Sequence, residues 1–176
     1  MRREDFEHVL AAAAYVCGEV ELVVVGSQAI LGSHPDAPVE LLQSMEVDIY
    51  PARAPEKSDL IDGALGDGSR FHETFGVYAH GVGPETAKAP AGWQERLVRV
   101  PIPARVGSTR EAVALCLEPH DVVLSKVVAG RERDCDFARV MLRSGLVGRD
   151  ELSARVDDLP VDDRTRRHVR SMLGAL

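Results

Sequence analysis

The chain has 176 residues, of which 45% are hydrophobic and 28% charged, a balance that suits a folded protein with a full core. Its formal net charge of −7 excludes a general positive field for nucleic acid, although it leaves room for a local basic patch. No apolar run is long enough for a membrane-spanning helix, so no membrane contact is expected, and the acidic N-terminal stretch is not expected to be a secretory signal. The three cysteines, Cys17, Cys116 and Cys135, lack metal-site spacing and indicate reduced thiols in a cytoplasmic protein.

Helical and strand patterns alternate through the first part of the chain. The expected elements are a helix over the first twenty residues, a strand at 21–25, a short helix at 28–31, a strand at 45–50 and a helix at 57–65. Gly18 suits the end of the first helix, and Gly26 and Ser27 form a turn directly after the first strand.

The second part of the chain becomes more helical. A strand or hairpin is expected at 71–82, an edge strand interrupted by Pro101 and Pro103 at 97–106, and a short apolar run at 112–117. Pro119 opens a helix that is expected to run toward Ser144, and two shorter helices follow at about 149–157 and 162–173. The sequence predicts one α/β domain with a core over about residues 1–110 and a mostly helical part over about 111–176.

The stretch SMEVDIYP places two carboxylates on one face of a strand. Side chains alternate along a strand, so Glu46 and Asp48 share a face, while Val47 and Ile49 share the opposite face and must point to the core. Paired carboxylates with this spacing can hold Mg²⁺ together with substrate phosphates. The other interpretation is two acids on the solvated face of an edge strand.

The turn at Gly26 and Ser27 favours the first interpretation. Gly26 lets backbone come close to a ligand, and Ser27 offers a hydroxyl and an N–H group where a helix begins, an arrangement that suits phosphate oxygens. A phosphate site followed by a carboxylate strand is what phosphoryl or nucleotidyl transfer needs.

A second group of charges occupies the stretch DVVLSKVVAGRERDCDF. Lys126 and Arg133 are seven residues apart, so they share a face if one helix spans both. Valines flank Lys126, which places its stem near the core boundary and its charge within reach of a phosphate. A solvated helix face with local ion pairs is the other interpretation.

Both stretches together resemble the nucleotidyltransferase superfamily, and in particular its small bacterial members of the abortive-infection and toxin–antitoxin type. The resemblance rests on Gly26-Ser27, on the acid-x-acid strand of Glu46 and Asp48, and on the helix with Lys126 and Asp134, and it covers about residues 20–142. GVGPETAKAPAGWQERLV also resembles a stretch of an uncharacterised branch of that group. The first acid of the family is more often Asp, and here it is Glu46.

The resemblance implies a nucleotidyltransferase-like mixed sheet flanked by helices and a metal-dependent transfer of a nucleoside monophosphate from a nucleoside triphosphate. It implies that Glu46 and Asp48 bind Mg²⁺ or Mn²⁺, and that Gly26, Ser27, Lys126 and Arg133 bind the nucleotide. Asp134 would support catalysis. The acceptor is RNA (a tRNA end included), a protein or a small molecule, and the protein is expected to be part of a toxin–antitoxin pair with a cognate antitoxin.

A third catalytic carboxylate, which many family members carry on a later strand, is not evident. His80 stands at that position, with Glu85 in a loop after it and His72 and Glu73 before it. His80 can serve as a base because its ordinary pKa lies near neutrality. The alternative function is a catalytically inactive protein of the same fold that binds a nucleotide or a partner.

Overall fold

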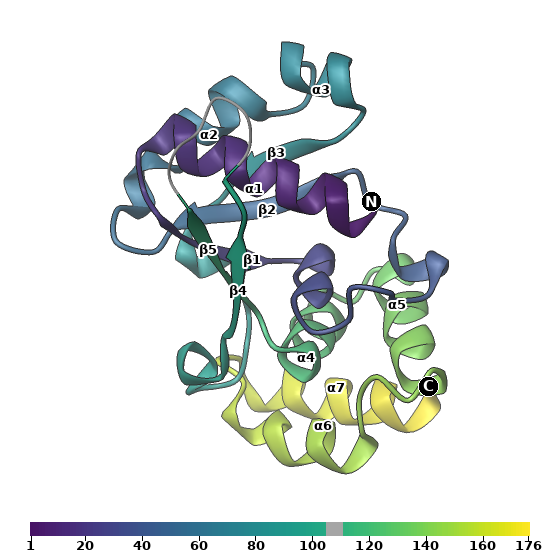
Figure 1. The fold of residues 1–176 in the computed structure, drawn as a ribbon. Helices are drawn as coiled ribbons and strands as arrows, with labels where there is room; N and C mark the ends of the chain where they lie inside the picture. The colour runs from purple at the N-terminus through teal and green to yellow at the C-terminus, as the bar shows by residue number, and fades with distance from the viewer. Residues whose placement is uncertain (105–110) are drawn as a thin grey trace.

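The computed structural model describes residues 1–104 and 111–176 and has a mixed α/β fold (Figure 1). Five strands form one sheet in the order β3-β2-β1-β5-β4. Their bounds are Glu21–Val25 for β1, Glu46–Pro51 for β2, Tyr78–Gly81 for β3, Val98–Ile102 for β4 and Ala112–Cys116 for β5. The sheet is mixed because β1 runs parallel to β5 and antiparallel to β2, while β2 and β3 are parallel. The expected mixed sheet is confirmed.

Strand β1 lies at the centre of the sheet, between β2 and β5, and four of its five residues are buried, as predicted for a strand covered on both faces. The prediction of alternation in β2 is also confirmed, since Val47 and Ile49 are fully buried while Glu46 and Asp48 remain partly exposed. Strand β4 is an edge strand, as predicted from Pro101. The predicted strand continued to 106, but β4 ends at Ile102, residues 103 and 104 are not strand, and 105–106 lie outside the described residues.

The helices form two groups in Figure 1, one beside the sheet and one below it. Helices α1 (Arg3–Cys17), α2 (Ser58–Leu65) and α3 (Arg70–Phe75) lie with β2 and β3 in the upper half. Helices α4 (Pro119–Ala129), α5 (Glu132–Arg143), α6 (Arg149–Arg155) and α7 (Asp163–Ala175) form the lower half. The helical C-terminal part is confirmed, although β5 belongs to the sheet.

The segment expected to be a strand or hairpin at 71–82 is strand only in its second half. Its first half is α3, because Ser69 caps the helix by accepting a hydrogen bond from the His72 backbone N–H. Gly76 ends that helix in the left-handed conformation, with φ of 70°. The helix cap at Ser69 and the helix end at Gly76 explain why this half of the segment is helical despite its strand-like residues.

The long helix expected from Pro119 toward Ser144 is in fact two helices. Gly130 ends α4 in the left-handed conformation, with φ of 67°, and Arg131 precedes α5 in an extended conformation. The prediction that Lys126 and Arg133 share one helical face is therefore wrong, because they lie on different helices.

Short 3₁₀ helices complete the chain around the sheet. They are η1 at Ser27–Gly32, η2 at Val39–Leu41, η3 at Pro55–Lys57, η4 at Pro84–Thr86, η5 at Trp93–Arg96 and η6 at Val156–Asp158. The short helix expected at 28–31 is confirmed as η1. Among the described residues, no helix has both the length and the apolar character that crossing a bilayer requires.

Candidate active site

Strand pairing brings three ligand-type side chains together at one end of β1, β2 and β3. Asp48 pairs with Val25, the last residue of β1, and also with His80 on β3. Glu46 lies two residues before Asp48 and therefore projects from the same face. The Nδ1 atom of His80 lies 3.1 Å from Asp48 Oδ1 and 3.6 Å from Glu46 Oε1. One ligand atom from each of the three residues falls within 4.8 Å of the others.

Tyr78 is a fourth member of this cluster, on the same face of β3 as His80. Its hydroxyl donates a 2.8 Å hydrogen bond to Glu46 Oε2. Burial and the neighbouring Glu46 carboxylate raise the pKa of Tyr78 to about 12, so the hydroxyl remains a donor at neutral pH. Sequence reasoning missed Tyr78, although its position two residues before His80 was a usable signal.

The two carboxyl groups have opposite pKa shifts. Burial, together with the neighbouring Glu46, raises the pKa of Asp48 to about 6. Burial also acts to raise the pKa of Glu46, but hydrogen bonds from Asp48, Tyr78 and His80 outweigh it, so that pKa is lowered. Two acids this close resist ionising together, and a divalent cation between them would remove that repulsion.

Gly26 shapes the site from the neighbouring strand. Its backbone has φ of 69° and ψ of −168°, a combination open essentially to glycine alone. A Cβ atom built there would lie 2.0 Å from Asp48 Oδ2. The structure gives one reason for this glycine, which is that it makes room for the Asp48 carboxylate. Its close approach to a ligand stays a prediction.

A cavity of about 860 Å³ opens over this cluster and reaches α4 and α5. Its walls combine the three cluster residues with side chains from five other segments, most of them basic or polar. The lining residues are Ser27, Glu40, Leu41, Gln43, Ser44, Glu46, Asp48, His80, Thr86, Lys126, Arg131, Arg133, Asp134, Asp136, Phe137, Arg139, Val140 and Arg143.

Lys126 and Asp134 form an ion pair across the break between α4 and α5. Lys126 Nζ donates to Asp134 Oδ1 at 2.9 Å and lies 5.3 Å from the centre of the Phe137 ring. Only 3% of the Asp134 side chain is exposed, and its Oδ2 atom is buried with no hydrogen-bond partner among the described residues. A buried carboxylate oxygen without a partner is costly, which is typical of sites that receive a ligand.

The basic side of the cavity belongs to α5 and the residues before it. Arg131 and Arg133 form no salt bridge with another described residue, whereas Arg143 is paired with Glu40 at 2.8 Å. Ser27, the first residue of η1, also lines the cavity.

The cavity thus collects both predicted groups of residues. Every predicted site residue lines the cavity except Gly26, which lies against the Asp48 carboxylate. The other residues considered for a third acid, Glu85, His72 and Glu73, do not line it. His72 instead pairs with Asp67 at 3.0 Å. The catalytic and binding roles of the cavity residues stay predictions.

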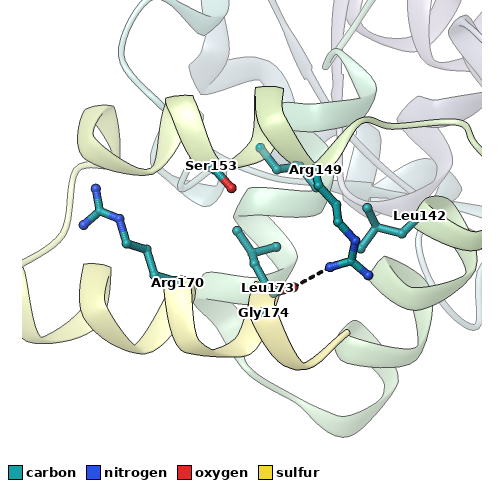
Figure 2. A pocket seen from close by; sticks show the side chains of 7 residues that line it. Leu142, Arg149, Ser153, Arg170, Leu173 and Gly174 are labelled. Carbon is teal, nitrogen blue, oxygen red and sulfur yellow. Dashed lines mark hydrogen bonds between the residues drawn. The ribbon is translucent and has the colours of Figure 1, made fainter.

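A second hollow, of about 250 Å³, lies among the C-terminal helices and differs in character. Leu142, Leu152 and Leu173 contribute apolar walls, and no acid or histidine lines it. Figure 2 shows Arg149 reaching from α6 to the Leu173 carbonyl oxygen on α7, a 2.8 Å hydrogen bond. Both of its arginines are engaged, Arg149 with the Leu173 carbonyl oxygen and Arg170 with Asp157 at 2.6 Å, so this hollow lacks the free charge and the carboxylates of the large cavity.

A mixed sheet whose Gly-Ser turn adjoins an acid-x-acid strand, facing a lysine across a cavity, defines a protein of the nucleotidyltransferase class. Comparison with protein families agrees with this. Residues 5–170 match the model of a family described as "Nucleotidyltransferase of unknown function (DUF6036)", and the chain belongs to that family. Neither the curated proteins nor the solved structures yielded a match.

Proposed function

We propose that this protein is a metal-dependent enzyme that transfers a nucleoside monophosphate from a nucleoside triphosphate to an acceptor. The observation that carries the proposal is that the Glu46–Asp48 strand and the Lys126–Asp134 pair face one cavity. A volume of about 860 Å³ is within the range of small-molecule sites, so a nucleotide fits. Membership of a nucleotidyltransferase family supports the same activity.

The residues of the cavity divide into two functional groups. Lys126 and Arg133 would bind the triphosphate as cations, and Ser27 would donate its hydroxyl to a phosphate oxygen. Asp134 would keep the Lys126 ammonium in place through their 2.9 Å contact. The buried position of this pair restricts the lysine to a small range of positions, which favours a fixed orientation of the phosphates.

Glu46 and Asp48 would hold Mg²⁺ or Mn²⁺, and their carboxylate oxygens suit such hard cations. When bound, the metal would neutralise charge that develops on the phosphates and activate the attacking oxygen. Tyr78 would fix one oxygen of Glu46 and leave the other toward the cluster, because its hydroxyl already donates to Oε2.

The proposed reaction is a displacement at the α-phosphorus of the nucleoside triphosphate. A hydroxyl of the acceptor attacks, the new phosphorus–oxygen bond forms, and the bond to pyrophosphate breaks. A carboxylate of the cluster takes the proton that the hydroxyl loses. Arg131 and Arg133 have charges not committed to salt bridges with described residues, so they can receive the departing pyrophosphate.

The acceptor in this proposal is RNA, such as a tRNA end, a protein or a small molecule. The arginines on α5 favour an anionic acceptor. The resemblance to small bacterial toxin–antitoxin proteins supports a role as one member of such a pair, with a cognate antitoxin as partner. The three cysteines are free thiols, which supports a cytoplasmic location.

Label transfer from nucleotides tests the proposal directly. Purified protein is incubated with each of the four α-labelled nucleoside triphosphates, with Mg²⁺ or Mn²⁺, and with total RNA or protein from a bacterial lysate. We expect one nucleotide to label an acceptor and to release pyrophosphate, and Asp48→Asn to abolish both. Asp59→Asn, which changes an exposed aspartate on α2, should retain full activity. Nucleotide binding without pyrophosphate release would contradict the proposal and point to the inactive alternative.

A further inference from the structure

His80 on β3 places an imidazole nitrogen beside the two carboxylates of β2, at the position where a third acid was expected. His80 Nδ1 lies 3.1 Å from Asp48 Oδ1 and 3.6 Å from Glu46 Oε1, so it is close to one oxygen of each acid. Two metal-bound atoms that are each about 2.0–2.3 Å from a cation are separated by distances of this order. The three atoms already have the spacing of a common coordination shell.

Strand pairing fixes this position of the imidazole. His80 pairs directly with Asp48 in the parallel β2–β3 register, and Tyr78 pairs with Glu46. A register slip of one residue would turn His80 to the opposite face and bring Ala79 in its place. Ala79 and Val47 are fully buried, so the slip would also expose core residues. The core therefore holds the imidazole against the carboxylates.

Gly26 and Tyr78 hold the two oxygen donors in the same way. The Asp48 carboxylate rests against Gly26 with no room for a Cβ, and the Glu46 carboxylate accepts the Tyr78 hydrogen bond. Each of the three donors thus has its own structural support. Such support orients metal ligands and is typical of a built site rather than of exposed acids that meet by chance.

We propose that His80 is a ligand of the metal, and that this mixed oxygen and nitrogen site prefers Mn²⁺ to Mg²⁺. The proposal rests on the proposed function for the presence of a metal and goes beyond it in naming the third ligand and the ion. Imidazole is a ligand of transition-metal ions, whereas Mg²⁺ favours all-oxygen surroundings. Mn²⁺ suits carboxylate oxygens and is also a transition-metal ion, so an added imidazole nitrogen favours Mn²⁺ over Mg²⁺. In this proposal His80 acts as a metal ligand and not as the general base, because its Nδ1 faces the two carboxylates.

Direct observation of the metal-bound nitrogen tests this assignment. Mn²⁺ is added to the full-length protein, free Mn²⁺ is measured by electron paramagnetic resonance, and pulsed measurements detect ¹⁴N coupled to the bound ion. The proteins compared are the wild type, His80→Ala, His80→Asp and His168→Ala, in which an exposed histidine on α7 is removed as a control. Mg²⁺ affinity is obtained by competition against bound Mn²⁺.

We expect the wild type to show ¹⁴N coupling and to require at least about tenfold more Mg²⁺ than Mn²⁺ for half occupancy. His80→Ala should lose the nitrogen signal and bind Mn²⁺ roughly 10–100-fold more weakly, while His168→Ala should match the wild type. His80→Asp, which restores an all-oxygen site, should bind Mg²⁺ more tightly than His80→Ala does. A circular dichroism melt of each variant confirms that it is folded.

Three results would overturn the assignment: no bound Mn²⁺, no ¹⁴N coupling in the wild type, or coupling that persists in His80→Ala. Equal affinities for Mg²⁺ and Mn²⁺ would overturn the metal preference. These readouts separate this proposal from the proposed function. Label transfer without ¹⁴N coupling would support the proposed enzymatic activity and exclude His80 as a metal ligand. Coupling without label transfer would support the metal site and exclude the proposed activity.

Discussion

Gly26 and the Asp48 carboxylate lie against each other at the ends of neighbouring strands, and no residue larger than glycine fits at position 26. A Cβ on Gly26 would lie 2.0 Å from Asp48 Oδ2, and the backbone there has φ of 69°. The turn after β1 is therefore part of the carboxylate cluster rather than only a connection. This relationship links the two sequence motifs physically, because the glycine of the first determines where the acid of the second can lie.

Gly26→Ala should disable the site and weaken the fold. The backbone conformation costs a non-glycine residue about 1–3 kcal/mol, and the methyl group must displace the carboxylate. A displacement of about 1 Å at a catalytic group can reduce the rate roughly 100-fold. Label transfer and urea unfolding measure the two effects.

Gly18→Ala is the matched control for that substitution. Gly18 has a similar φ of 72°, at the end of α1, but a Cβ there would meet nothing within 4 Å. We expect a loss of about 1–2 kcal/mol from backbone strain and unchanged transfer per folded molecule. Equal activity losses in the two variants would show that strain, and not the contact with Asp48, explains the effect.

Asp48→Asn should stabilise the metal-free protein at neutral pH although it abolishes the proposed transfer. Burial raises the pKa of Asp48 from 3.8 to about 6 in the folded state, so the fold binds that proton more tightly than the unfolded chain does. Stability due to this group is therefore present below pH 3.8 and is lost as the pH rises through about 6. The neutral amide avoids that loss.

Thermal unfolding in a chelator at two pH values measures this effect. At pH 7 we expect Asp48→Asn to be more stable than the wild type by about 1–3 kcal/mol, or about 2–4 °C in Tm for each kcal/mol. Near pH 4 the difference should largely disappear. The exposed Asp59→Asn variant should differ little from the wild type at either pH. A lower Tm for Asp48→Asn at pH 7 would contradict the cause given for the pKa shift.

The strand motifs were predictable because their signals are local. Alternation in EVDIY places Val47 and Ile49 in the core and leaves Asp48 on the other face, and the structure confirms this face assignment. The pairing of Asp48 with His80 was not predictable in the same way. It depends on which strand lies beside β2, and that is decided by packing between segments about thirty residues apart.

The helical motif was located correctly but given the wrong local structure. Helical residues continue on both sides of Gly130, so its role as a helix end was hidden by the pattern around it. The break matters for the site, because it lets α5 turn and bring Asp134 against Lys126. Sequence reasoning thus named both residues while missing the turn that joins them.

Lys126→Met should destabilise the protein through the carboxylate that it leaves behind. Asp134 is only 3% exposed, and removal of one partner of a buried ion pair costs about 3–5 kcal/mol. Adding Asp134→Asn to Lys126→Met removes the unpaired charge and should recover most of that stability, while nucleotide binding should remain lost. Urea unfolding and nucleotide titration measure the two quantities. A double variant as unstable as Lys126→Met alone would exclude the ion pair as the cause.

The last prediction concerns Glu118, which lies outside the cavity at the start of α4. Its Oε2 accepts hydrogen bonds from the His120 backbone N–H at 3.1 Å and from Arg155 at 2.6 Å. Its Oε1 lies 2.7 Å from His120 Nδ1, which must carry a proton because Nε2 accepts from the Gly148 N–H. Burial acts to raise the pKa of Glu118, but the hydrogen bonds from His120 and Arg155, together with the Arg155 charge, outweigh it and lower that pKa to about 2.

A carboxyl with a lowered pKa stabilises the fold above its unfolded pKa of about 4.5, and that contribution is lost as the pH falls toward about 2. Glu118→Gln should therefore cost about 3 kcal/mol at pH 7, and the cost should shrink steadily between pH 4.5 and pH 2. Glu151→Gln is the matched control, because Glu151 also pairs with Arg155 but is 51% exposed, and it should cost about 0.5 kcal/mol or less. Urea unfolding of both variants at pH 7, 4 and 3 measures these differences. A cost for Glu118→Gln that does not change with pH would mean that its size and shape, and not its charge, hold α4 to α6.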